Sequence, residues 1–141
     1  MNPLRIAVLG TGHLGSIHTK LWNSVEGATL TGIFDPDMDR ATSIAEQHNT
    51  TAFSSVEEAL DHADAVTIAA PTSAHHALAK QCLEANKHCF IEKPITSTYA
   101  EACNLIDLAA GKGLVIQVGH VERFNPGLSA LHGYKLAPTF I

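Results

Sequence analysis

The stretch Gly10-Thr11-Gly12-His13-Leu14-Gly15 (GTGHLG) decides which fold this chain of 141 residues is expected to adopt. It follows an apolar run at 4–9 and precedes apolar residues at helical spacing, which indicates a turn from a first strand into a first helix. In a dinucleotide-binding unit, Gly10 permits the tight turn, Gly12 lets backbone amides approach a pyrophosphate, and Gly15 lets the helix pack on the sheet. The N-terminus of the helix then offers unpaired N–H groups to the phosphates.

An acidic residue, Asp35, ends the second expected strand (28–34) and lies 20 residues after Gly15. At this spacing an acid accepts hydrogen bonds from the adenosine ribose, and its charge repels a 2′-phosphate, so the sequence predicts NAD rather than NADP. Two alternatives stay open. The glycine-rich turn can belong to a domain that binds no nucleotide, with Asp35 as a helix cap, and Arg40 can reach a 2′-phosphate instead of lying solvated on its helix.

Strand-like and helix-like patterns alternate along the rest of the chain. Apolar, strand-like runs are expected at 4–9, 28–34, 50–53, 65–70, 89–91 and 114–118, with amphipathic segments between most of them. Short connections between such elements favour a parallel sheet that is covered on both faces. We therefore predict an α/β fold, a doubly wound Rossmann sheet with strand order 3-2-1-4-5-6.

Ligands of such sheets bind at the carboxyl ends of the strands. The segments expected there are Pro71-Thr72 after the fourth strand, Glu92-Lys93-Pro94 after the fifth and Gly119-His120 after the sixth. A lysine that is partly desolvated at this edge can donate a hydrogen bond to a substrate oxygen whose carbon loses hydride. Taken alone, Lys93 is more often a surface residue paired with Glu92, and its position at the edge favours catalysis.

Composition excludes several other classes of protein. The chain is 45% hydrophobic and 16% charged, as in an ordinary globular domain, and its net charge of −5 provides no basic surface for nucleic acid. No apolar run is long enough to cross a membrane. Three cysteines without a CxxC pair are typical of reduced thiols in a cytoplasmic protein, and the nine histidines do not fall at metal-ligand spacings, so we expect no metal.

Four motifs together resemble the glucose–fructose oxidoreductase / inositol dehydrogenase (Gfo/Idh/MocA) family: GTGHLG, PTSAHH (71–76), IEKPIT (91–96) and VGHVERFNP (118–126). The last motif is most similar in wording to UDP-N-acetylglucosamine 3-dehydrogenase-like members. The resemblance implies NAD(P)-dependent transfer of hydride between the nicotinamide and a secondary hydroxyl of a sugar, an inositol or a nucleotide sugar. A non-catalytic dinucleotide sensor or interaction protein on the same scaffold is the alternative.

The resemblance also implies roles for individual residues. Lys93 would sit at the reacting hydroxyl, with Glu92 and Pro94 shaping the nicotinamide edge and the Lys93–Pro94 bond in the cis form. Residues of the loop along the cofactor would be Pro71, Thr72 and His75. Members commonly carry T-P-N where this chain has Ala70-Pro71-Thr72, so Thr72 stands in the place of that asparagine. The substrate would lie near Lys93, His120 and Arg123.

The resemblance covers the N-terminal half of a typical member, in which a second, α+β domain follows. It implies that 1–120 form the dinucleotide-binding domain and that 121–141 form the connection to that second domain and its start. We expect this chain alone to be catalytically inactive. The full-length protein is expected to be a cytoplasmic homo-oligomer that acts on a small molecule.

Overall fold

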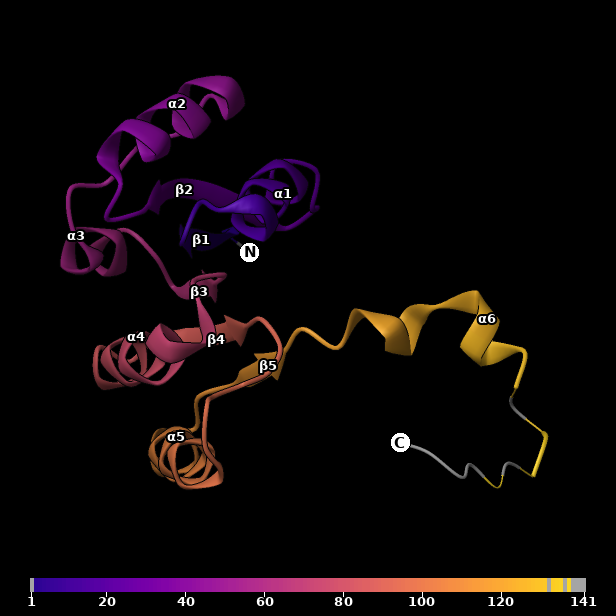
Figure 1. Ribbon diagram of the computed structural model, residues 1–141. Coiled ribbons are helices and arrows are strands. Elements are labelled where there is room, and N and C mark those ends of the chain that lie inside the picture. Colours follow the sequence, from indigo (N-terminus) through magenta and orange to yellow (C-terminus); the bar gives the residue numbers. More distant parts are fainter. Residues whose placement is uncertain (1, 132, 136, 138–141) are drawn as a thin grey trace.

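The centre of the fold is a parallel sheet of five strands. The computed structural model describes residues 2–131, 133–135 and 137. The strands are β1 (Leu4–Leu9), β2 (Ala28–Phe34), β3 (Ala65–Ile68), β4 (His88–Ile91) and β5 (Ile116–Val118), in the order β2-β1-β3-β4-β5 (Figure 1). Because all of them run in the same direction, their carboxyl ends share one edge. The predicted doubly wound α/β fold is confirmed.

The outermost predicted strand, 50–53, is reduced to a single parallel bridge between Ile33 and Ala52. The N–H of Ile33 donates to the carbonyl of Thr51 and the N–H of Phe53 to the carbonyl of Ile33, both at 2.8 Å. The segment therefore lies beside β2, in the predicted third position. The chain leaves the edge at once because Ser55 caps the helix that follows, by accepting a hydrogen bond from the N–H of Glu58.

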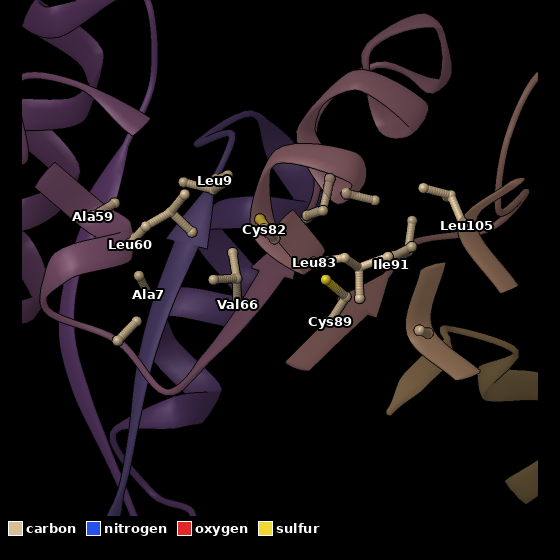
Figure 2. Close-up of a cluster of buried hydrophobic side chains, with 14 of the residues drawn as sticks. Ala7, Leu9, Ala59, Leu60, Val66, Cys82, Leu83, Cys89, Ile91 and Leu105 are labelled. Carbon is tan, nitrogen blue, oxygen red and sulfur yellow. The ribbon is translucent and has the colours of Figure 1, made fainter. Parts of the chain in front are cut away.

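Helices cover the sheet on both faces (Figure 1). Those of the main body are α1 (His13–Trp22), α2 (Met38–His48), α3 (Val56–Asp61), α4 (Thr72–Glu84) and α5 (Tyr99–Lys112). A larger buried cluster joins the sheet to α3, α4 and α5 through residues such as Leu60, Leu83 and Leu105 (Figure 2). A smaller cluster around Val8 and Ile33 joins the opposite face to α1 and α2. Together they hold the strand ends in fixed positions.

The residues after β5 leave the sheet. A 3-10 helix, η1 (Val121–Phe124), and a short helix, α6 (Pro126–Ser129), extend away from the main body (Figure 1). The side chains of 121–131 are exposed, and Phe124 is exposed to 84%. Residues 138–141, the last part of the segment expected to begin the second domain, lie outside the described residues. None of the described helices is long and apolar enough to cross a membrane.

Candidate active site at the carboxyl ends of the strands

The glycine turn after β1 has a geometry that only glycine allows at two of its positions. Gly10 has a φ of +91°, and a Cβ there would lie 2.8 Å from the backbone nitrogen of Ala70. A Cβ on Gly15 would lie 1.8 Å from the carbonyl oxygen of Gly10, so α1 packs directly against the turn. A Cβ on Gly12, by contrast, would meet no atom within 4 Å. The space in front of Gly12 is therefore open to a ligand.

Helix N-termini along this edge differ in how their N–H groups are satisfied. The helices α2, α3 and α5 begin with side-chain caps from Asp37, Ser55 and Thr98. The helices α1 and α4 begin at Gly12 and Pro71 without a side-chain cap and without an acidic residue in the first turn. Uncapped N–H groups and the positive end of the helix dipole favour an anion. The first turn of α1, with the exposed His13 and Leu14, thus suits the pyrophosphate of a dinucleotide.

A cavity of about 360 Å³ lies beside this turn, at the ends of β1, β2 and β3. It brings together Gly10, Asp35 and Pro71, three residues predicted to bind the cofactor. Its remaining lining residues are Leu9, Phe34, Pro36, Arg40, Ala70, Ala74, Ala77 and Leu78. A mostly apolar cavity with one carboxylate in its wall suits the adenosine half of a dinucleotide.

The carboxylate of Asp35 is buried and already makes four hydrogen bonds. Its Oδ2 accepts from the backbone N–H and the hydroxyl of Thr11, at 2.7 and 3.0 Å. Its Oδ1 accepts from the N–H of Asp37 at 2.9 Å and from Nη2 of Arg40 at 2.7 Å. Burial acts to raise the pKa of Asp35, but the hydrogen bonds outweigh it and hold the pKa below the usual value. This carboxylate therefore stays charged at neutral pH.

Arg40 lies on α2 with a half-exposed side chain, but that side chain does not extend freely into solvent. Its guanidinium bonds to Asp35 and also pairs with Asp37, Nη1 to Oδ2 at 3.2 Å. The side chain is 46% exposed and lines the cavity beside Gly10. Of the donors to Asp35, only Arg40 belongs to a half-exposed, flexible side chain. A ribose hydroxyl that approaches Oδ1 must therefore displace or rearrange Arg40.

A second cavity, of about 560 Å³, lies at the ends of β4 and β5. It is lined by Lys93, Gly119, His120, Val121, Glu122, Arg123 and Leu128. The three residues predicted to meet the substrate, Lys93, His120 and Arg123, thus face one space although they come from different elements. The cavity has three basic side chains and one acidic one, Glu122, in its wall. It is suited to a polar ligand that carries oxygen acceptors.

The carboxylate of Glu92 contacts partners other than the side-chain ammonium of Lys93. It is buried, with Nε2 of His18 at 2.7 Å from Oε1, and its Oε2 accepts the backbone N–H of Lys93 at 3.1 Å. No ion pair of the Lys93 ammonium occurs within the part of the chain that the structure describes. The surface pairing of Lys93 with Glu92 is therefore not formed. The Lys93–Pro94 peptide bond is cis, as the resemblance implied.

His75 lies beneath the loop rather than on its open surface. The residue is 1% exposed, and its Nδ1 and Nε2 lie 2.9 and 2.8 Å from the carbonyl oxygens of Pro94 and Ala70. It therefore ties the loop after β3 to the loop after β4. Thr72, the first residue of α4, precedes His75 by three residues and is half-buried. Support of the cofactor loop is the role that this geometry suits.

Two contacts of the site were missed by sequence reasoning. Sequence reasoning assigned His18 no role in the site, and the pairing of Arg40 with Asp35 was not foreseen. The partners His18 and Glu92 are 74 residues apart, and no local pattern joins them. Arg40 lies five residues after Asp35, a spacing that a turn into a helix brings together and that could have revealed the pair. Among the described residues, no group of three metal-ligating side chains comes together.

The family model for oxidoreductases with an NAD-binding Rossmann fold, Gfo/Idh/MocA, matches residues 4–120. This chain belongs to that family. UDP-N-acetylglucosamine 3-dehydrogenase of Acidithiobacillus ferrooxidans is 39% identical over 131 residues, which are 93% of this chain and 41% of the relative. A solved structure of that protein superposes with a TM-score of 0.88, at 39% identity, and the match covers 94% of this chain and 43% of that one.

Other proteins similar to this chain carry different cofactors in their names or structure descriptions. The scyllo-inositol 2-dehydrogenase (NAD⁺) of Bacillus subtilis is 37% identical over 129 residues, 89% of this chain and 38% of the relative. A biliverdin reductase of Synechocystis, solved with biliverdin and NADP⁺, has a TM-score of 0.86 and 25% identity, over 94% of this chain and 42% of that one. The chain thus spans about two fifths of the relatives it matches.

Proposed function

We propose that this protein is an NAD(P)-dependent oxidoreductase that moves hydride between the nicotinamide and a secondary hydroxyl carbon of a sugar, an inositol or a nucleotide sugar. The observation that carries the proposal is the pair of cavities at one sheet edge, one holding Asp35 and the other Lys93. The edge of the sheet connects them across the ends of β1, β3 and β4. An extended dinucleotide binds along such an edge with its two halves in separate cavities.

The residues present fit a dinucleotide in detail. The backbone N–H groups at the start of α1 would hold the pyrophosphate in the open space before Gly12, and the apolar cavity beside Gly10 would hold the adenosine. The nicotinamide would then lie toward Glu92 and Pro94, at the end of β4. When bound there, the nicotinamide supplies the acceptor or donor of hydride.

Lys93 is the residue that we propose for proton transfer. During oxidation the hydrogen on the carbon leaves with its bonding electrons, and the hydroxyl proton must pass to a base. A neutral Lys93 amine accepts that proton, and in the reverse direction its ammonium returns a proton to the carbonyl oxygen. His120 and Arg123, from the same cavity wall, would hold the other oxygens of the substrate. The names of the relatives, dehydrogenases of a nucleotide sugar and of an inositol, favour this chemistry over cofactor sensing alone.

NAD is the cofactor that we propose. Support comes from Asp35, whose carboxylate lies in the wall of the adenosine cavity and has a lowered pKa. A negative charge there repels the 2′-phosphate of NADP. Arg40 offsets part of this repulsion, because its guanidinium lies on the same carboxylate. The preference therefore depends on the balance between these two side chains.

A turnover assay tests the proposed activity. The full-length protein is incubated with NAD or NADP and with a panel of inositols, free sugars and nucleotide sugars, and NAD(P)H formation is followed by absorbance. We expect turnover with at least one member of the panel and its loss in Lys93→Met. A protein that binds NADH tightly but turns over no polyol or sugar in either direction would instead support the sensor.

A further inference from the structure

A buried carboxylate joins α1 to the loop that carries Lys93. The side chain of Glu92 is 9% exposed. One of its oxygens lies 2.7 Å from Nε2 of His18, on α1, and the other accepts the backbone N–H of Lys93 at 3.1 Å. A carboxylate is costly to bury unless its oxygens are hydrogen-bonded. The contact with His18 restricts where the Glu92 carboxylate can lie, and the hydrogen bond from the Lys93 N–H ties the Lys93 backbone to that carboxylate.

The surroundings hold this contact in one arrangement. A Cβ on Gly119, after β5, would lie 3.2 Å from the carboxyl carbon and both oxygens of Glu92, so the bare backbone closes one side. The ring of His18 meets the ring of Phe90 edge-on, with centroids 5.3 Å apart and planes at 63°. The His18 side chain is only 16% exposed. The imidazole therefore has an aromatic neighbour that orients it and a carboxylate that it binds.

We propose that His18 is a positioning residue for Lys93. Acting through Glu92, it fixes the backbone from which the lysine side chain enters its cavity. The inference rests on the proposed function, because only there does the position of the amine matter. His18 also belongs to the helix whose N-terminus would hold the pyrophosphate. The first turn of α1 would thus hold the cofactor, and its second turn, through His18 and Glu92, would hold the Lys93 backbone. The same helix would in this way fix the position of the lysine relative to the cofactor.

Amide hydrogen exchange of the ¹⁵N-labelled chain tests this without any substrate. His18→Phe keeps a ring against Phe90 but removes the donor to Glu92, whereas His18→Gln keeps an N–H near the place of Nε2. We expect the Lys93 amide to exchange about tenfold faster in His18→Phe, and at close to the wild-type rate in His18→Gln. The Thr11 amide, which donates to Asp35, should be unchanged and serves as the internal control.

Turnover adds a second readout. Because small displacements of reacting groups can cost about 10²-fold in rate, we expect kcat in His18→Phe to fall by about 10- to 100-fold with little change in NADH affinity, and His18→Gln to restore it. The matched control is His62→Phe. The ring of His62 also contacts a phenylalanine ring, that of Phe53, with centroids 5.2 Å apart, but His62 lies at the end of α3.

The outcomes separate the two proposals. Should His18→Phe fail to fold, His18→Asn, with an amide too short to reach Glu92, replaces it in both measurements. An unchanged Lys93 exchange rate, together with unchanged kcat, would overturn the role of His18 and leave the proposed function in place. A wild-type protein that neither binds NADH nor turns over would overturn the proposed function, and the exchange rates would still decide whether His18 fixes the Lys93 backbone.

Discussion

Arg40 donates a hydrogen bond from Nη2 to Oδ1 of Asp35 at 2.7 Å. The acid proposed to bind the adenosine ribose is therefore already paired with a guanidinium at the rim of its cavity. The two side chains of this pair have opposite effects on cofactor choice. The carboxylate repels a 2′-phosphate, and the guanidinium attracts one. Removing the Asp35 carboxylate should therefore shift the preference toward NADP, and removing the Arg40 guanidinium should shift it toward NAD.

Cofactor choice should follow this balance. We expect the wild-type chain to bind NADH more tightly than NADPH. Arg40→Leu should weaken NADPH binding by roughly tenfold, about 1.4 kcal/mol, while NADH affinity stays the same or rises, because the ribose no longer has to displace Arg40. Calorimetric titration of both cofactors measures it. Arg5→Leu is the control, because Arg5 pairs with Asp64 outside the adenosine cavity. Tighter NADPH binding in Arg40→Leu would show that the arginine does not neutralise Asp35.

Lys93 should matter for turnover and not for cofactor affinity. In the full-length protein we expect Lys93→Ala to lower kcat by about 10²-fold or more, the range typical of acid–base groups, with little change in the Kd of NADH. Lys93 lies outside the adenosine cavity, which supports the second expectation. Lys20→Ala, an exposed lysine at the end of α1, is the control. Turnover near that of wild type would make Lys93 a structural residue.

The two glycines of the turn should separate folding from binding. Gly15→Ala should destabilise the fold by about 1–3 kcal/mol or more, because its Cβ would overlap the carbonyl of Gly10. Gly12→Ala should keep the wild-type Tm, since its Cβ meets nothing, and should weaken NADH binding by about tenfold because the methyl occupies the pyrophosphate space. Thermal melts and titrations measure both. Unimpaired NADH binding by Gly12→Ala would contradict the proposed pyrophosphate position.

Acid stability should depend on Asp64. The hydrogen bond from the Arg5 side chain, with a further one from its backbone, lowers the pKa of Asp64 to about 2. Its unfolded value is near 3.9, so the carboxylate contributes stability above about pH 4 and loses it as the pH falls toward 2. We expect the drop in Tm between pH 4 and pH 2 to be shallower in Asp64→Asn. The exposed Asp107→Asn, on α5, should leave the slope as it is.

The chain of 141 residues should bind NADH without catalysing turnover. We propose that 121–141 lead into a substrate domain, since the relatives are more than twice as long. Without that domain the Lys93 cavity lacks partners that orient the sugar, and orientation alone can contribute about 7–11 kcal/mol to a reaction. Titration with NADH tests the expected binding, and the panel of inositols and sugars tests the expected absence of turnover. Robust NADH formation by this chain would mean that its active site is complete.

The local sequence was sufficient to predict the elements and the edge at which they meet. Hydrophobic periodicity identified the five strands of the sheet and most of the helices between them, and the spacing from Gly15 to Asp35 predicted the adenosine side. The parallel order of the strands then brings the segments after β3, β4 and β5 to one edge. Lys93, His120 and Arg123, the three residues that the family resemblance implied for the substrate, line one cavity. Each of these inferences depends on residues close together in the sequence.

Tertiary structure alone decided which side chains bind each other. The pairing of His18 with Glu92 joins residues 74 apart, and the place of His75 between Ala70 and Pro94 depends on how two loops approach each other. The periodicity of the sequence indicates which face of a helix or strand a residue occupies. Which other side chain that residue contacts depends on distances set by the packing of the whole sheet and its helices.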